Sequence, residues 1–131
     1  MTARVETAPP DIQIRGLEDA LRGLKMYDKM NVPVLGVIEN MSYLQMPDGT
    51  RMDIFGNGGG KTLAEMNGVP LLGEVPIDPT IRIGGDTGKP IIISDPENPA
   101  AKVMQGIAEK IAGRLSLNAI KNASIMEEKT T

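Results

Sequence analysis

The 131-residue sequence contains no cysteine, no histidine and no tryptophan. Without cysteine, the chain can form no disulfide and can offer no thiolate to a zinc ion or an iron–sulfur cluster. Without histidine, it lacks the usual general base of enzymes and the commonest metal ligand in proteins. We therefore expect no metal site within this chain.

Aromatic residues are also scarce, and the charges of the two signs nearly balance. Tyr27, Tyr43 and Phe55 are the only aromatic residues, so the core must be built from Val, Ile, Leu, Ala and nine Met, which favours layered α/β packing. A net charge of −3 and the lack of a basic run argue against a nucleic-acid partner. No apolar run is long enough to cross a bilayer, and the first residues contain no hydrophobic signal core. We expect a cytoplasmic protein with no membrane partner.

One stretch, DIFGNGGGKTLAE (residues 53–65), ends in Gly-Lys-Thr as a phosphate-binding loop does. A Walker A loop requires a glycine five positions before Gly60, and that position is Phe55. The preceding residues are polar and turn-like, whereas a P-loop follows a buried strand. A glycine-rich turn entering a helix is the better interpretation, with Lys61 as a solvated surface lysine, although a helix N-terminus can still attract an anion.

Length and periodicity predict one domain with three segments. Residues 1–16 are expected to be an irregular lead-in, residues 17–116 the folded domain, and residues 117–131 a frayed polar tail. A helix is predicted from Leu17 to Tyr27. A final helix begins at Asp95-Pro96 or Asn98-Pro99, with one apolar face formed by Ala100, Val103, Met104, Ile107, Ile111 and Leu115.

Three short apolar runs, at residues 34–38, 71–75 and 91–93, predict buried strands covered by helices on both faces. Asp48-Gly49 predicts a hairpin turn, and residues 59–67 a short helix closed by Gly68. Strands joined by helices predict a mostly parallel sheet whose ligands lie beyond the carboxyl ends of the strands. Those ends are Glu39-Asn40-Met41, Pro76-Ile77-Asp78 and Ser94-Asp95.

Three motifs in this order carry a family resemblance: Glu39-Asn40-Met41-Ser42, then Phe55-Gly56-x-Gly58-Gly59-Gly60, then Pro76-x-Asp78-Pro79-x-Ile81-Arg82. From about Leu17 to Leu115 the sequence resembles the C-terminal half of the Mrp/ApbC iron–sulfur cluster carriers, ATPases of the MinD/ParA branch of P-loop NTPases. The resemblance implies a partial three-layer P-loop NTPase-like fold, with a mostly parallel sheet flanked by helices. It also implies that the glycine-rich stretch is not the P-loop, which in this family lies N-terminal to all the residues seen here.

The resemblance implies an ATP site but no cluster ligands. Many members of the family carry Cys-x-x-Cys where this chain has Met46-Pro47-Asp48-Gly49, and the pair from two subunits is thought to hold a bridging cluster. Thioether and glycine cannot replace the thiolates.

The resemblance also suggests the residues that contact the nucleotide. Asn40 corresponds to the asparagine that binds the adenine edge, and Pro76 and Asp78 to the loop against the base, largely through its backbone. Each also has a simpler interpretation as a turn residue at a strand end. Arg82 is expected to form a structural ion pair with Asp78 or Asp86.

The intact family would bind ATP, dimerise and take part in iron–sulfur cluster assembly or transfer to acceptor proteins. This chain supplies no phosphate loop, no Mg²⁺ ligands and no catalytic residue, so we expect no ATPase activity from it alone. It would bind ATP weakly, or only together with a P-loop-containing half. The alternative is a non-enzymatic module that uses an open sheet edge or the hairpin for partner binding or dimerisation.

Overall fold

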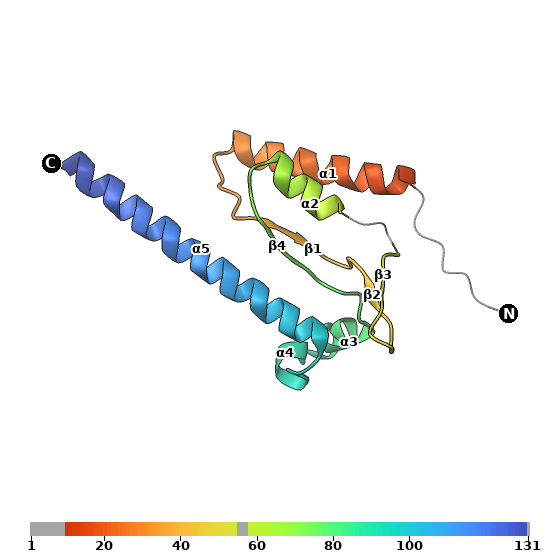
Figure 1. The fold of residues 1–131 in the computed structure, drawn as a ribbon. Coiled ribbons are helices and arrows are strands. Elements are labelled where there is room, and N and C mark those ends of the chain that lie inside the picture. The colour runs from red at the N-terminus through yellow and green to blue at the C-terminus, as the bar shows by residue number, and fades with distance from the viewer. Residues whose placement is uncertain (1–9, 55–57, 131) are drawn as a thin grey trace.

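The computed structural model describes residues 10–54 and 58–130 (Figure 1). Helices and short strands alternate along the chain, as an α/β protein requires. In order, the elements are α1 (Pro10–Lys29), β1 (Val37–Glu39), β2 (Leu44–Gln45), β3 (Arg51–Met52), α2 (Gly59–Met66), β4 (Leu71–Glu74), α3 (Pro79–Thr87), α4 (Ile91–Ser94) and α5 (Pro99–Thr130).

β1 and β4 form a parallel sheet in which Val37 pairs with Leu71 and Ile38 with Gly73. In Figure 1, α1 and α2 lie on one side of these strands and α5 lies on the other. α2 packs against both strands and α5 packs against β4. A parallel sheet flanked by helices is the fold class that the sequence predicted, and it is confirmed.

The core is small and centres on β4 and α5. Leu72, Val75 and Ile107 are buried, and Ile81, Val103, Met104 and Ile111 pack against them. Most of the predicted apolar face of the last helix is therefore in the core. The first predicted strand is not covered by helices on both faces as expected, since the Ile38 side chain is 45% exposed.

The predicted hairpin is confirmed, since β2 and β3 pair antiparallel with Leu44 opposite Met52. Gly49 adopts a φ of 88°, which glycine tolerates best. The Asp48 carboxylate accepts hydrogen bonds from the backbone N–H and the hydroxyl of Thr50. The hydroxyl bond, followed by the backbone bond, lowers the pKa of Asp48.

The third predicted strand is wrong: Ile91–Ser94 is the helical turn α4. The N–H groups of Ile93 and Ser94 both donate to the Pro90 carbonyl at 3.0 Å. This turn buries Ile91 and leaves Ile93 78% exposed. A short apolar run cannot by itself distinguish a strand from a helical segment.

The sequence prediction also missed α3, although the usual start and stop signals flank it. Asp78 is its N-cap, Pro79 stands at its first helical position, and Gly88 closes it with a φ of 71°. The last helix does begin at Asn98-Pro99, where the Asn98 side chain accepts from the Ala100 N–H at 2.8 Å.

Two expected irregular segments are helical. α1 begins at Pro10, so the lead-in prediction is wrong for residues 10–16. α5 continues to Thr130, so the frayed-tail prediction is wrong for residues 117–130. No proline or glycine follows Gly113 to interrupt it. Because α5 extends beyond the sheet (Figure 1), Leu115 lacks cover and is 52% exposed, contrary to its predicted place on the buried face.

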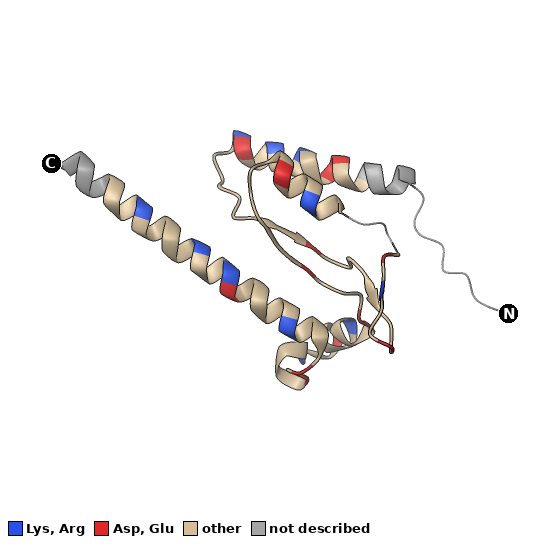
Figure 2. Ribbon diagram, viewed as in Figure 1, with Lys and Arg blue, Asp and Glu red and all other residues tan. Residues whose placement is uncertain are grey.

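Charged positions are spread along the helices and around the hairpin, and acidic residues also end both strands of the parallel sheet (Figure 2). None of the helices that the structure describes has the combination of length and apolar character needed to cross a membrane.

Candidate functional site

The carboxyl ends of β1 and β4 meet at one edge of the sheet, and the chain segments that follow them stay side by side. The Val75 N–H donates to the Glu39 carbonyl at 2.8 Å, and the Ser42 N–H donates to the Val75 carbonyl at 2.9 Å. Further on, the Ile77 N–H donates to the Tyr43 carbonyl at 2.7 Å. Residues 39–44 and 74–77 are therefore held in register beyond the strands. They carry the predicted nucleotide-contacting residues Asn40 and Pro76, and the third, Asp78, follows directly after Ile77.

Asn40 lies in an exposed turn directly after β1. Its side-chain oxygen accepts a hydrogen bond from the Met41 N–H at 2.9 Å. Met41 has a φ of 51°, a left-handed conformation that is uncommon for a residue with a side chain. Asn40 thus has the turn-stabilising role that was its simpler interpretation, and contact of its amide with adenine stays a prediction.

Asp78 joins two helices at the same edge. One carboxylate oxygen accepts from the Thr80 N–H at 2.9 Å, and the other accepts from the side-chain amide of Asn98 at 3.0 Å. Burial acts to raise the pKa of Asp78, but the hydrogen bonds from Thr80 and Asn98 outweigh it, so the pKa is lowered. Since both oxygens are occupied, the side chain holds the starts of α3 and α5 together.

A cavity of about 370 Å³ lies between this edge and the hairpin. Pro76 and Asp78 line it, together with three of the four positions that correspond to the family's Cys-x-x-Cys: Met46, Pro47 and Gly49. The remaining lining residues are Leu44, Gln45, Ile77, Pro79, Pro99 and Ala100. Asn40 is not part of this lining, so the three predicted residues share an edge of the sheet but not this cavity.

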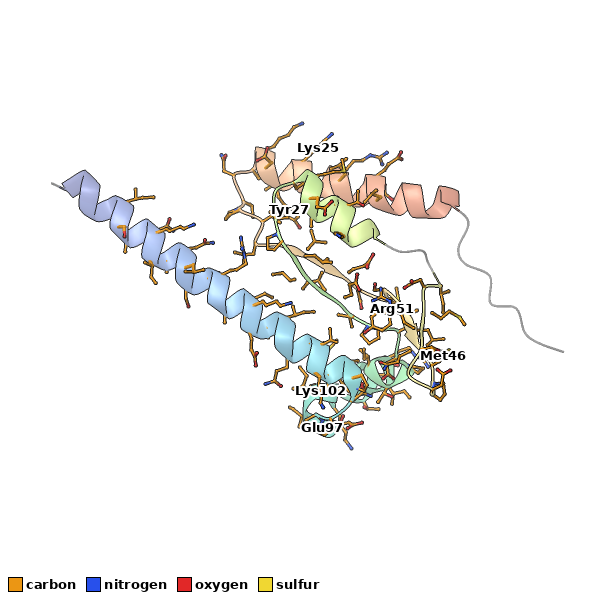
Figure 3. All side chains as sticks on the ribbon, viewed as in Figure 1. Lys25, Tyr27, Met46, Arg51, Glu97 and Lys102 are labelled. Atoms are coloured by element: carbon orange, nitrogen blue, oxygen red, sulfur yellow. The ribbon has the colours of Figure 1, made fainter. Side chains whose placement is uncertain are left out.

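Arg51 links the β2–β3 hairpin to the parallel sheet through an ion pair. Its guanidinium donates to Asp53 at 2.9 Å and to Glu74, the last residue of β4, at 2.8 Å. It also lies 4.1 Å from the centre of the Tyr43 ring, within the range of a cation–π contact. The bond to Asp53, followed by that to Glu74, raises the pKa of Arg51. Figure 3 shows Arg51 and Met46 on this hairpin.

The glycine-rich stretch does not have the surroundings of a P-loop. The strand before it is β3 of the hairpin and not a central strand of the sheet. At the start of α2, the Gly60 N–H donates to a carboxylate oxygen of Glu39 at 3.1 Å, and Lys61 is exposed. A carboxylate of the chain therefore occupies a donor that a phosphate would use. Phe55 and Gly56 of the motif lie outside the described residues.

The sequence did not reveal the links made by Glu39 and Arg51, because each joins segments more than 20 residues apart. A motif-level signal existed for Glu39, which is the last residue of β1 and directly precedes Asn40. The expected ion pair of Arg82 with Asp78 or Asp86 is not among the ion pairs found in the described part of the chain. Residues 10–54 and 58–130 also contain no group of three acidic, histidine or cysteine side chains that could hold a metal.

Curated relatives of this chain are iron–sulfur carriers. The chain is 46% identical over 120 residues to an iron–sulfur cluster carrier protein of Synechocystis, an alignment that covers 90% of this chain and 33% of the relative. It is 46% identical over 114 residues to the carrier protein of Pyrococcus furiosus, covering 86% and 37%. It is 40% identical over 116 residues to the iron–sulfur cluster transfer protein NUBPL of Dictyostelium discoideum, covering 88% and 35%. The chain thus spans about a third of the length of these relatives.

Among solved structures, the cell division ATPase MinD of Pyrococcus furiosus resembles the chain with a TM-score of 0.56 and 28% identity. The match covers 74% of this chain and 37% of MinD. The ParA family model, described as the NUBPL iron-transfer P-loop NTPase, matches residues 5–112. This match, together with the carrier relatives and the parallel sheet, confirms the resemblance predicted from the three motifs. The chain belongs to the NUBPL/ParA family of iron-transfer P-loop NTPases.

Proposed function

We propose that this chain is the part of an ATP-binding iron–sulfur cluster carrier that contacts the adenine base. We also propose that it does not hydrolyse ATP alone. The observation that carries the proposal is the paired course of residues 39–44 and 74–77, which brings Asn40 to the same sheet edge as Pro76 and Asp78. This is where α/β sheets bind ligands. The cluster-carrier function is proposed from the named function of the relatives, and therefore depends on membership of the family.

The hydrogen bonds of the edge suggest how the base would be held. Pro76 has no N–H, the Ile77 N–H is taken by Tyr43, and the Asp78 carboxylate is taken by Thr80 and Asn98. Residues 76 and 77 thus have no free N–H donor, and the acceptor oxygens of the Asp78 side chain are already bonded. The backbone carbonyl oxygens of this loop would accept from the exocyclic amine of adenine. Asn40 would add its side-chain amide, which offers both a donor and an acceptor.

Phosphate binding and hydrolysis would need groups that this chain does not supply. The start of α2 is engaged by Glu39, and Lys61 is exposed on the surface. Affinity for ATP should therefore come mainly from a P-loop-containing half, supplied by a partner or by a homodimer of a longer protein. We further propose a cytoplasmic location. We also propose delivery of clusters to iron–sulfur acceptor proteins, in line with the relatives named as cluster carrier and cluster transfer proteins.

Calorimetry with ATP tests this proposal. The chain alone should bind ATP no more tightly than about 1 mM. Adding the remaining two thirds of the Synechocystis carrier, expressed separately, should tighten binding by about 100-fold or more, and Asn40→Ala should weaken binding in that mixture. Lys61→Ala is the matched control and should have no effect. Micromolar binding by the chain alone that is lost in Lys61→Ala would reject the proposal, since the glycine-rich stretch would then be the phosphate site.

A second candidate is a partner-binding or dimerisation module without a nucleotide role. It is favoured by the two-stranded sheet, whose outer edges have no further strand within the described residues, and by the exposure of Ile38. Size-exclusion chromatography over a range of concentrations, with and without ATP, separates the two candidates. Self-association of the chain that does not change with ATP favours the partner-binding module. Self-association that requires ATP favours the nucleotide-binding carrier.

A further inference from the structure

Glu39 connects two motifs that lie about 20 residues apart in the sequence. One carboxylate oxygen accepts a hydrogen bond from the Ser42 hydroxyl at 2.5 Å. The other accepts the Gly60 N–H at 3.1 Å. A single side chain thus links the turn after β1 to the first turn of α2.

The first turn of α2 has no side-chain cap from its own N-cap residue. Gly58 occupies the N-cap position with a φ of 86° and can provide no side-chain acceptor, and the first turn contains no acidic residue. Backbone N–H groups of a first helical turn have no partner within the helix. Glu39 therefore performs, from the end of β1, the capping role that a serine or aspartate normally plays at the N-cap.

Close packing explains the glycine at position 60. A Cβ atom there would lie 2.9 Å from the Cβ of Glu39 and 3.3 Å from its carboxyl carbon. Only a residue without a side chain lets the helix start approach the strand end closely enough for the hydrogen bond. The glycine at position 60 thus allows the close contact between the start of α2 and the Glu39 side chain.

The same contacts enclose the turn that carries Asn40. Glu39 and Ser42 stand on either side of Asn40 and Met41, and their side chains are hydrogen-bonded to each other. Ser42 is only 6% exposed, and its N–H is bonded to Val75 of the adjoining segment. The left-handed conformation of Met41 is therefore held from both ends of the turn.

We propose that Glu39 is a positioning residue that fixes the Asn40–Met41 turn by joining Ser42 to the start of α2. Its importance for the nucleotide rests on the proposed function, but its role in the turn does not. In this proposal the start of α2 at Gly60 supports the turn that carries Asn40 and does not bind phosphate.

Hydrogen exchange of single backbone amides, measured by NMR on the full chain, tests the role in the turn. Glu39→Ala should accelerate exchange at Gly60 and Ser42 by about tenfold, the effect of losing a hydrogen bond to a charged group. Exchange at Ile107 in the core should stay within about twofold. Glu39→Gln should restore most of the protection, because its amide oxygen can accept from Gly60 and its amide nitrogen can donate to the Ser42 hydroxyl. Glu65→Ala, at an exposed glutamate of α2, is the matched control.

Unchanged protection at Gly60 and Ser42 in Glu39→Ala would overturn the proposal, as would a uniform increase that includes Ile107. Failure of Glu39→Gln to restore protection would also overturn it, because charge alone would then be responsible. If Glu39→Ala does not fold, Ser42→Ala replaces it and should accelerate exchange at Met41, while unchanged exchange there overturns the proposal.

Adding adenosine to the same samples should shift the Asn40 amide less in Glu39→Ala than in wild type. Absence of any shift in wild type would reject the proposed function while the exchange data still decide the role of Glu39.

Discussion

Replacing Asp78 by alanine should destabilise the fold, because this carboxylate holds the starts of two helices. It caps α3 through the Thr80 N–H and accepts the side-chain amide of Asn98, the residue whose oxygen bonds the Ala100 N–H at the start of α5. Loss of an N-cap typically costs about 1 kcal/mol. Loss of the partly buried bond to Asn98 costs about 0.5–1 kcal/mol more. We therefore expect about 1.5–2 kcal/mol less stability at pH 7, or a Tm lower by about 5–10 °C.

The dependence on pH gives this prediction its specific signature. Because the pKa of Asp78 is lowered in the folded protein, its carboxylate stabilises the fold above its unfolded pKa of about 3.9. That contribution is lost as the pH falls through the lowered folded pKa. The difference in stability between wild type and Asp78→Ala should thus be full at pH 7 and should shrink progressively below about pH 4.

Urea unfolding followed by circular dichroism at a series of pH values measures this difference. Asp86→Ala, an exposed aspartate of the same helix α3, is the control and should change stability by less than about 0.5 kcal/mol. The reasoning would be refuted if Asp78→Ala matched the control at pH 7. It would also be refuted if the loss of stability were the same at pH 3 as at pH 7.

Three other predictions concern packing, the hairpin and metal. Gly73→Ala should cost about 1–3 kcal/mol in urea unfolding, because the new Cβ would lie 2.5 Å from the Ile107 side chain; a neutral effect would contradict the close contact of β4 and α5. Arg51→Met should lower global stability by less than about 1 kcal/mol but should make the hairpin more sensitive to limited proteolysis, because the ion pair to Glu74 is lost; an unchanged cleavage rate would count against this link. Reconstitution with iron and sulfide should leave the chain colourless, since it has no cysteine and no histidine; a stoichiometric cluster absorbance that survives desalting would disprove this.

The sequence predicted the elements whose signals are local. The hairpin follows from Asp48-Gly49, the short helix α2 from the residues before Gly68, and the first two strands from apolar runs joined by a helix. Their parallel pairing follows from the handedness of such crossovers. The hairpin and α2 were confirmed because each depends on residues close together in the chain. The first predicted strand, residues 34–38, is confirmed only in part, since β1 is Val37–Glu39.

The predictions were wrong where contacts with other parts of the fold determine the secondary structure or the role of a residue. Ile91–Ile93 has the composition of a strand, but the turn after Pro90 makes it helical. The tail after residue 116 was judged by polarity, whereas its good helix formers extend α5 past the sheet. At the candidate site, the roles of Asn40 and Asp78 in the fold could not be read from their motifs, because their partners are set by the turn geometry and by Asn98.

The claim that most needs a direct test is that the edge formed by Asn40, Pro76, Ile77 and Asp78 receives the base while the glycine-rich stretch receives no phosphate. Amide spectra of the ¹⁵N-labelled chain, titrated separately with adenosine and with inorganic triphosphate, test both halves of this claim. Adenosine should shift the amides of Asn40 and Ile77, and triphosphate should leave those of Gly59, Gly60 and Lys61 unchanged. Shifts at Gly59, Gly60 and Lys61 with triphosphate, and none at Asn40 and Ile77 with adenosine, would contradict it.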